Sequence, residues 1–273
     1  DAASLTRGRL VAGRRPPTVS AVSAALVTGA SAGLGRAFAE RLAATGYDVV
    51  LVARDGERLA ALGADLEHRF GCAAQALPAD LTDRASLQRV ADRLADPENP
   101  LDLLVNNAGN ALRKPFLAND VVEEEQLLDL HVRATLVLTH AALGPMTERR
   151  SGGVINVSSV AGWAPQGTYS AHKAWVTSFS QAVASQVADT GVRVMALTPG
   201  LVRTELHERA GIKTGRFPAL AWLDADEVAE QTLDAWARGH AVHVPSARYK
   251  ALATLMRNAP YETIYRLRTR GKQ

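Results

Sequence analysis

Short apolar runs alternate along the chain with longer stretches in which apolar positions recur every three or four residues. The short runs are rich in valine, leucine and alanine and are bounded by glycine or polar residues, a pattern typical of parallel strands buried on both faces. They predict strands at 24–27, 48–52, 73–77, 101–105, 154–157, 192–197 and 242–245. The amphipathic stretches predict helices at 33–45, 58–70, 86–95, 121–147, 169–188 and 226–237.

The alternation of strand and helix predicts the α/β fold class, as a single doubly wound Rossmann fold. About seven parallel strands with helices on both faces are expected, joined by right-handed crossovers. Three parts are predicted: a flexible basic leader at 1–20, one domain at 21–245 and a basic C-terminal extension at 246–273. Residues 204–223 lack clean periodicity, which predicts a substrate loop over a pocket.

The composition is typical of a globular protein, with 47% hydrophobic and 22% charged residues. No run approaches the ~18 apolar residues of a membrane span, so no transmembrane segment is expected. Cys72 is the only cysteine, which excludes an intrachain disulfide and a multi-cysteine metal site. With no pattern of a secretory signal, these features predict a cytoplasmic protein.

The formal charge of +3 is concentrated in the first twenty residues, and the rest of the chain is balanced. A nucleic-acid partner is therefore not expected. A second basic stretch at 257–273 holds five basic residues against Glu262. We expect a solvated tail there, with contact to an acidic partner or a membrane surface as the alternative.

A glycine-rich turn follows the first expected strand and opens the first expected helix. Gly29, Gly33 and Gly35 permit a tight turn and a close approach of backbone to a ligand. The start of a helix offers unpaired N–H groups and a positive dipole end to a diphosphate. The sequence therefore predicts a dinucleotide site at this turn.

The end of the second strand indicates which dinucleotide binds. About 20 residues beyond the glycines, an acidic residue would bind a ribose 2′-hydroxyl and an arginine would accommodate a 2′-phosphate. Arg54 stands there, which favours NADP, and Ser31 can add a hydroxyl to the same phosphate. Asp55 follows directly, so NAD stays as the less favoured alternative.

Tyr169 and Lys173 lie four residues apart, about one helical turn, so both side chains reach the same site. A cation close to a phenol favours the phenolate and lowers its pKa from ~10, which permits acid–base catalysis at neutral pH. The spacing alone is weak evidence, because such pairs also occur on solvated helix faces.

Five motifs occur in an order that gives the chain a specific resemblance. They are the glycine turn at 28–35, Asn106-Asn107-Ala108-Gly109, Ser158-Ser159, Tyr169-x-x-x-Lys173, and Pro199-Gly200 with Thr204. In these motifs the chain resembles the short-chain dehydrogenase/reductase family of the Tyr-x-x-x-Lys type, over about residues 21–245. The resemblance implies that this part is an NADP-binding catalytic domain.

The resemblance also implies roles for the matching residues. Tyr169 exchanges a proton with the substrate oxygen, Ser159 hydrogen-bonds that oxygen, and Lys173 binds the nicotinamide ribose and lowers the pKa of Tyr169. Asp80 matches the family's contact with the adenine. The cofactor-binding residues implied besides Tyr169 and Lys173 are Gly29, Ser31, Gly33, Leu34, Gly35, Arg54, Asp80, Asn107, Ala108, Gly109, Pro199, Gly200, Val202 and Thr204.

The chain departs from the family in two places. His131 stands where the family usually has an asparagine that holds a water between the lysine and solvent. One hypothesis gives His131 a part in a proton relay, with a pH dependence near histidine's ~6.5, and the other makes it a space-filling residue. Ser159 precedes Tyr169 by ten residues rather than about thirteen, so the loop with Trp163 and Pro165, a candidate pocket wall, is short.

The expected function is an NADP(H)-dependent oxidoreductase that interconverts a carbonyl and a secondary alcohol, with the hydride from the nicotinamide and the proton from Tyr169. The alternative is a catalytically weak NADP-binding sensor or scaffold on the same fold. Further candidate pocket residues are Phe116, Leu201, Leu206 and Trp222. They favour a small hydrophobic substrate, such as a ketone, a steroid-like alcohol or a 3-oxoacyl group.

Two expectations concern partners and metals. The habits of the family imply a homodimer or homotetramer formed through the helices that begin at Val121 and Tyr169. Val176, Phe179 and Val183 on the second helix can serve either the core or such an interface. No histidine spacing matches a set of metal ligands, so no metal is expected.

Overall fold

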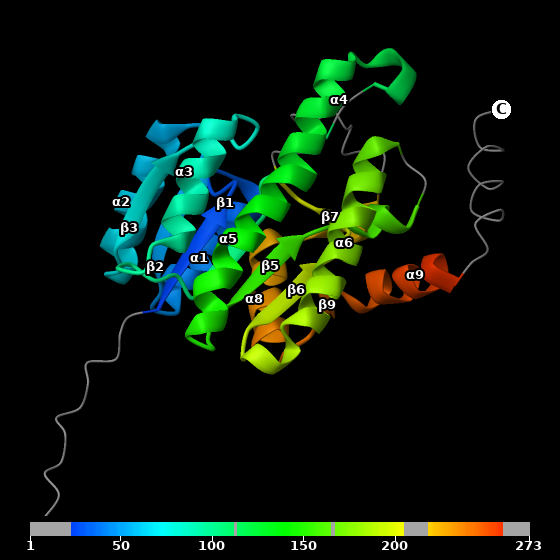
Figure 1. Ribbon diagram of the computed structural model, residues 1–273. Helices are drawn as coiled ribbons and strands as arrows, with labels where there is room; N and C mark the ends of the chain where they lie inside the picture. The colour runs from blue at the N-terminus through cyan, green and yellow to red at the C-terminus, as the bar shows by residue number, and fades with distance from the viewer. Residues whose placement is uncertain (1–22, 112–113, 165–166, 205–217, 259–273) are drawn as a thin grey trace, which may run out of the picture.

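The computed structural model describes residues 23–111, 114–164, 167–204 and 218–258, which form the layered fold of Figure 1. The expected leader at 1–20, Pro165, Leu206, most of the expected substrate loop and the end of the basic extension lie outside these ranges. Within them, no helix is long and apolar enough to cross a membrane.

A seven-stranded parallel sheet forms the middle layer, in the order β3-β2-β1-β4-β5-β6-β9. The strands are β1 (Ala24–Thr28), β2 (Asp48–Ala53), β3 (Ala74–Pro78), β4 (Leu103–Asn106), β5 (Gly153–Val157), β6 (Arg193–Leu197) and β9 (Val242–His243). In the register, Leu26 lies between Val50 of β2 and Leu104 of β4. The strand order reverses between β1 and β4, the place where doubly wound sheets bind nucleotides.

Helices cover both faces of the sheet, because its strands are apolar on both sides and need two buried layers. One face packs against α1 (Gly33–Ala44), α2 (Gly56–Phe70) and α8 (Ala225–Ala237). The other packs against α3 (Arg84–Ala95), α5 (Ala134–Glu148) and α6 (Thr168–Gln186). The predicted fold class is therefore confirmed.

The stretch predicted as one helix over 121–147 is helical throughout but changes its winding in the middle. A π-helical segment, η2 (Asp129–Arg133), joins α4 (Val121–Leu128) to α5. At its end the Ala134 N–H donates to the Asp129 carbonyl five residues earlier, rather than four. The wider turn contains His131, whose side chain is only 1% exposed.

The C-terminal part adds elements that the hydrophobic pattern did not predict. The basic extension begins as a helix, α9 (Ala247–Asn258), which lies beyond β9 at one side of the molecule (Figure 1). Two short strands, β7 (Leu201–Val202) and β8 (Trp222–Leu223), pair in parallel at either end of the expected substrate loop. One-turn helices in the described ranges are η1 (Phe116–Ala118), η3 (Val160–Trp163), η4 (Ala188–Thr190) and η6 (Ala219–Ala221).

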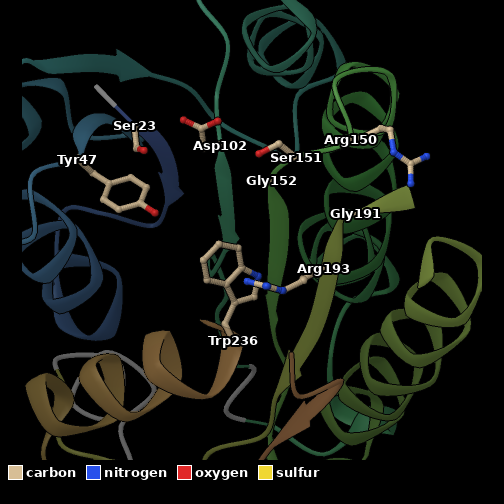
Figure 2. Close-up of a pocket in the computed structure, with 9 residues that line it drawn as sticks. All are labelled: Ser23, Tyr47, Asp102, Arg150, Ser151, Gly152, Gly191, Arg193 and Trp236. Atoms are coloured by element: carbon tan, nitrogen blue, oxygen red, sulfur yellow. The ribbon is translucent and has the colours of Figure 1, made fainter. Parts of the chain in front are cut away.

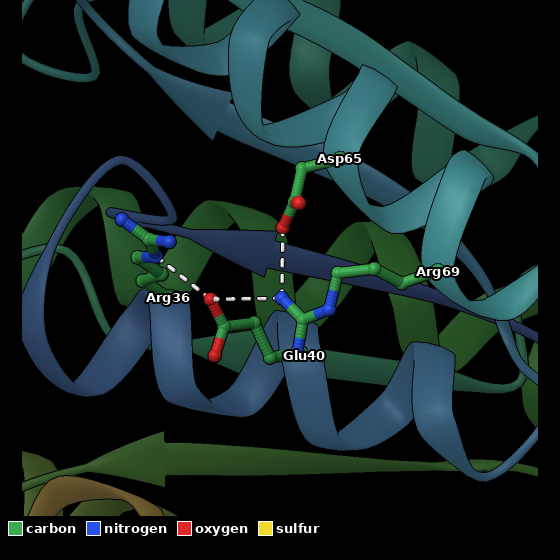
Figure 3. A network of polar contacts seen from close by, with 4 residues as sticks. All are labelled: Arg36, Glu40, Asp65 and Arg69. Atoms are coloured by element: carbon green, nitrogen blue, oxygen red, sulfur yellow. Dashed lines mark hydrogen bonds and ion pairs between the residues drawn. The ribbon is translucent and has the colours of Figure 1, made fainter.

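Charged side chains join α1 and α2 at the surface (Figure 3). Glu40 Oε1 accepts from Arg36 Nε at 2.8 Å and lies 3.9 Å from Arg69 Nη1, which also pairs with Asp65 at 2.8 Å. Exposed pairs of this kind contribute little to stability. For the site, the relevant point is that the Arg36 guanidinium is paired with Glu40.

Candidate active site

The predicted site residues gather at the carboxyl edge of the sheet. The glycine turn follows β1, Arg54 follows β2, Asn107 follows β4, Ser158 and Ser159 follow β5, and Pro199 comes shortly after β6. Parallel strands all end at the same edge, so residues distant in the sequence meet there.

Close contacts explain the glycines of the turn after β1. Gly29 and Gly33 have φ values of 68° and 54°, a region that favours glycine. A Cβ on Gly33 would lie 2.8 Å from the Thr204 Cβ, and a Cβ on Gly35 would collide with the Gly29 carbonyl. The turn therefore packs directly against Thr204 at positions where a side chain would not fit.

The start of α1 is built differently from the starts of four other helices. At α2, α3, α4 and α8 an aspartate side chain accepts hydrogen bonds from the first-turn N–H groups. Within the described residues, Ala32 at the start of α1 has no side-chain cap and the first turn carries no acidic residue. Together with Ser31 and Leu34, these free N–H groups form a cradle that fits a diphosphate.

Thr28, which was not among the expected site residues, ties β1 to β4. Its Oγ1 accepts from the backbone N–H groups of Asn107 at 2.9 Å and Ala108 at 3.0 Å. In return, the Asn107 side-chain amide donates to the Thr28 carbonyl at 2.9 Å. These bonds hold the residues after β4 against the start of the glycine turn. Gly109, two residues after Asn107, lies next to His131, since a Cβ on Gly109 would lie 3.2 Å from His131 Nε2.

Arg54 and Asp55 have separate surroundings although they are adjacent. The Asp55 carboxylate caps α2, where Oδ1 accepts from the Arg58 N–H at 3.0 Å and Oδ2 lies 3.4 Å from the Arg58 guanidinium. Arg54 is exposed at the end of β2. The next strand, β3, brings Asp80 to the same edge, and its Oδ1 accepts from the Thr82 N–H and hydroxyl at 2.9 and 2.7 Å.

Ser159 and Tyr169 meet across the short loop between β5 and α6. The Tyr169 hydroxyl lies near enough to Ser159 for that side chain to lower its pKa, but burial raises the pKa by more, so the net effect is a raised pKa. The expected lowering of the Tyr169 pKa is therefore not found in this structure. Ser159 Oγ also accepts from the Ala161 N–H at 3.1 Å, which begins η3 and orients the hydroxyl.

Lys173 lies one turn after Tyr169 on α6, as the spacing predicted, and its side chain is 5% exposed. Nζ donates to the Val157 carbonyl at 2.8 Å and lies 5.8 Å from the centroid of the Tyr169 ring. Burial lowers the pKa of Lys173 from 10.5 to about 8. The ammonium is therefore still protonated at neutral pH.

His131 is a neutral ring enclosed by the site. Its Nε2 accepts from the Asn110 N–H at 3.1 Å, and its ring meets the edge of Tyr169 with centroids 5.6 Å apart. Burial, followed by the charge of Lys173, holds the pKa of His131 well below its usual 6.5. The expected pH dependence near ~6.5 is therefore wrong for this side chain. Its backbone carbonyl accepts from the Thr135 hydroxyl at 2.8 Å.

Two further buried polar groups lie behind His131, and the sequence analysis did not assign them to the site. The His172 ring packs against His131 with centroids 5.7 Å apart. The pKa of His172 is lowered, chiefly by burial, although the nearby Glu124 acts in the opposite direction. Glu124 Oε1 accepts from the Asn119 side chain at 2.7 Å. Only the periodicity of the α4 and α6 residues could have indicated that these groups face each other.

The predicted pocket residues divide into two groups. Leu201 and Trp222 are paired in β7 and β8, and Trp163 lies in η3, with the Arg257 guanidinium of α9 5.8 Å from its ring. Phe116 lies in η1 and is 60% exposed. Leu201, Trp222 and Trp163 thus belong to elements that α9 contacts, whereas Phe116 belongs to the segment before α4.

A polar pocket of about 260 Å³ lies at the opposite, amino-terminal edge of the sheet (Figure 2). Ser23, Tyr47, Asp102 and Ser151 line it, and the Arg193 side chain reaches towards the Trp236 indole. None of the residues that the sequence predicted for cofactor or substrate lines it. It is therefore separate from the candidate active site.

Comparison with known proteins agrees with this geometry. The family model described as short chain dehydrogenase matches residues 23–214. A similar curated protein is the 3-oxoacyl-(acyl-carrier-protein) reductase of Aquifex aeolicus, which is 32% identical over 184 residues, 66% of this chain and 74% of the relative. The chain belongs to the short-chain dehydrogenase/reductase family, whose members are NAD(P)-dependent oxidoreductases.

Solved structures give the same assignment. A short-chain dehydrogenase from Sphingobium yanoikuyae in complex with NADPH is 36% identical, with a TM-score of 0.79 over 88% of this chain and 97% of that one. The bulky-bulky ketone specific alcohol dehydrogenase of Comamonas testosteroni is 28% identical, with a TM-score of 0.75 over 88% and 95% of the two chains. The chain is thus an NAD(P)-dependent short-chain dehydrogenase/reductase.

Proposed function

We propose that this enzyme reduces a hydrophobic ketone to a secondary alcohol with NADPH, using Tyr169 as the proton donor. The observation that carries the proposal is the pairing of Tyr169, whose pKa is raised by burial, with the nearby Ser159 hydroxyl, which acts on that pKa in the opposite direction. A phenol that stays protonated at neutral pH is suited to donate a proton to a developing alkoxide, which is the need of the reductive direction.

In this mechanism the nicotinamide, when bound, supplies the hydride to the carbonyl carbon. The Ser159 hydroxyl donates a hydrogen bond to the carbonyl oxygen and stabilises its developing negative charge. Tyr169 then releases its hydroxyl proton to that oxygen. Lys173 stabilises the resulting phenolate through its buried ammonium, and its bond to the Val157 carbonyl holds the side chain in place.

The surroundings of Arg54 and Asp55 support NADPH over NADH. The Asp55 carboxylate is committed to the cap of α2 and to Arg58, so it is poorly placed to bind a ribose hydroxyl. Glu40 holds Arg36, whereas Arg54 stands exposed beyond β2, where a 2′-phosphate would lie. The relative from Sphingobium yanoikuyae is described in complex with NADPH.

The substrate class rests on the pocket walls and on the relatives. Trp163, Leu201 and Trp222 supply apolar surface next to the expected substrate loop. The relative from Comamonas testosteroni is described as specific for bulky-bulky ketones, and the one from Aquifex aeolicus as a 3-oxoacyl reductase. We therefore place ketones with two sizeable apolar substituents first and 3-oxoacyl thioesters second.

A substrate and cofactor panel tests the proposal. Aliphatic, cyclic and aryl ketones and a 3-oxoacyl thioester are each offered with NADPH and with NADH, and the loss of absorbance of the reduced nicotinamide is followed. We expect turnover with NADPH and a bulky ketone, and a loss of about tenfold in NADPH affinity in Arg54→Ala with little change for NADH. Equal use of both cofactors by the wild type would contradict the assignment of Arg54.

Self-association is proposed through α4, α5 and α6. On α6 the Trp175 and Phe179 rings stack at 4.7 Å and are partly exposed, and Leu128 and Leu136 are 44% and 45% exposed. Val176 is buried at 1%, so it serves the core. Light scattering on a sizing column is expected to give two or four chains for the wild type and a smaller assembly for Phe179→Asp. A monomeric wild type would contradict the proposal.

A further inference from the structure

The helix α9 contributes one large buried aromatic side chain, Tyr249, which is 8% exposed. Its hydroxyl accepts from the Leu201 N–H at 3.2 Å and donates to the Ala221 carbonyl at 2.7 Å. Leu201 opens β7, and Ala221 immediately precedes β8. A single hydroxyl therefore joins the segment before residue 205 to the segment after residue 217.

The ring of Tyr249 lies directly against Gly200. A Cβ on Gly200 would collide with Cζ, Cε1 and Cε2 of this ring, the atoms at its hydroxyl end. The close approach of the ring therefore requires a glycine at this position, as any side chain would displace either the ring or the backbone. Gly200 of the Pro199-Gly200 motif thus packs against a residue nearly fifty positions later in the chain.

The segment 199–204 is held from its other side by the glycine turn. At Gly33 the backbone touches the Thr204 side chain so closely that a Cβ would lie 2.8 Å from the Thr204 Cβ. The segment thus runs between α9 at Gly200 and the start of α1 at Thr204. A segment fixed at both ends presents its backbone groups to a ligand in one arrangement, which lowers the cost of binding.

The hydroxyl of Tyr249 adds to what the strands provide. β7 and β8 form a ladder of only two residues, with one further bond from the Arg203 N–H to the Leu223 carbonyl at 2.9 Å. So short a pair is weak by itself. The Arg248 guanidinium, also on α9, adds a bond to the Trp222 carbonyl at 3.2 Å. Helix α9 is therefore well placed to keep β7 and β8 together.

We infer that Tyr249 is a positioning residue, which fixes the Pro199–Val202 backbone for the nicotinamide end of the cofactor and anchors both ends of the substrate loop. The part that concerns the cofactor rests on the proposed function, in which NADPH binds, and on the contact with the nicotinamide that the family resemblance implies for Pro199 to Thr204. The part that concerns the backbone does not, because it depends only on contacts within the chain.

The first experiment measures the backbone in the protein without added cofactor. Hydrogen–deuterium exchange of the Leu201 amide is compared between the wild type, Tyr249→Phe and the control Tyr47→Phe, whose hydroxyl lies at the opposite edge of the sheet. Loss of one hydrogen bond predicts an exchange rate about 3- to 10-fold higher in Tyr249→Phe alone, with amides of β4 and β5 unchanged. An unchanged Leu201 rate would overturn the inference.

The second experiment measures the consequence for the cofactor. In Tyr249→Phe the Kd for NADPH, followed by fluorescence, is expected to rise about 3- to 10-fold, while kcat changes by less than about twofold. This combination is expected when the ground state and the transition state lose the same binding interaction. Faster Leu201 exchange with an unchanged Kd would overturn the positioning role. A wild type that binds no NADPH would instead contradict the proposed function, and the exchange result would still decide the backbone contact.

The third experiment uses size complementation at Gly200. Gly200→Ala introduces the colliding Cβ and is expected to weaken NADPH binding and lower Tm. Tyr249→Leu lacks the Cε and Cζ atoms that would collide, so the double variant Gly200→Ala with Tyr249→Leu is expected to recover Tm relative to Gly200→Ala. Purely additive losses would contradict the contact. If Gly200→Ala does not fold, the exchange and NADPH-binding measurements on Tyr249→Phe decide whether Tyr249 positions the backbone.

Discussion

Burial sets the protonation states of the side chains around Tyr169. It raises the pKa of Tyr169, lowers that of Lys173 to about 8 and holds that of His131 well below 6.5. At neutral pH the site therefore contains a neutral phenol, a protonated lysine and a neutral imidazole. This combination suits proton donation to a carbonyl oxygen more than proton removal from an alcohol.

The rate of reduction is predicted to show no titration of His131 in the weakly acidic range. The pKa of His131 is depressed, so the side chain stays neutral as the pH falls through 6.5. We expect the pH profile of kcat between pH 5.5 and 7.5 to have the same shape in the wild type and in His131→Asn, whatever the change in absolute rate. An acid limb near pH 6.5 that disappears in His131→Asn would contradict this.

The pattern of motifs in the sequence predicted Ser159, Tyr169 and Lys173 as a candidate site, and the four-residue step on α6 does place Tyr169 and Lys173 close to each other. It was insufficient for their pKa values, which depend on groups brought from other elements. The surroundings of Tyr169 include His131 from the π segment, and those of His172 include Glu124 from α4. Such neighbours follow from the packing of α4, η2 and α6.

The N-termini of α2 and α3 differ from that of α1, the expected cofactor site, in whether a side chain caps the helix. Aspartates cap α2 and α3 and satisfy their first-turn N–H groups. At α1, in the described part of the chain, no side chain performs this role, and the helix begins at a glycine turn that packs against Thr204. The N-terminus of α1, which has no such cap, is the one expected to meet a diphosphate.

Replacement of Asp55 tests whether it serves the helix or the cofactor. Because the Asp55 side chain caps α2, Asp55→Ala is predicted to lower the free energy of unfolding by about 1 kcal/mol. The affinities for NADPH and NADH should stay nearly unchanged. Asp83→Ala, which removes the equivalent cap of α3, is the matched control and should give a similar loss in urea unfolding. A selective loss of NADH affinity in Asp55→Ala would support the alternative in which NAD binds.

The hydrophobic pattern predicted every strand of the main sheet and six helical stretches with bounds within two residues of those observed. It did not predict η2, β7, β8 or α9. The π segment lies inside one continuous helical stretch and so leaves no separate signal in the pattern. The strands β7 and β8 have two residues each, too few to show a period of two. The charges of the C-terminal stretch predicted only a basic extension. The apolar pattern of α9 is weak, because Leu252 and Leu255 are exposed and only Tyr249 and Ala253 are buried.

At the scale of the whole molecule, buried histidines make the fold sensitive to acid. The pKa values of His131 and His172 are lowered, and that of His243 is lowered to about 4, in each case chiefly by burial. Below pH 6.5 the unfolded chain therefore binds protons that the folded chain does not, and stability falls as the pH falls from 6.5 towards 4.

Urea unfolding at a series of pH values measures this effect. We expect the free energy of unfolding to decrease from pH 7 to pH 4.5, and the decrease to be smaller in His243→Gln, which removes one of the three groups. His243 lies in β9, away from the predicted catalytic residues, so the variant should still fold and bind NADPH. Equal acid sensitivity in both proteins would contradict the role of His243.

The central claim is that Tyr169 donates the proton in an NADPH-dependent ketone reduction. The most direct measurement compares the wild type with Tyr169→Phe under saturating NADPH and a bulky ketone, with the Kd for NADPH measured in parallel. We predict that kcat falls by about 10²- to 10⁴-fold while the Kd changes by less than about twofold, because only the proton donor is lost. Equal rates of NADPH oxidation in the two proteins would contradict the claim.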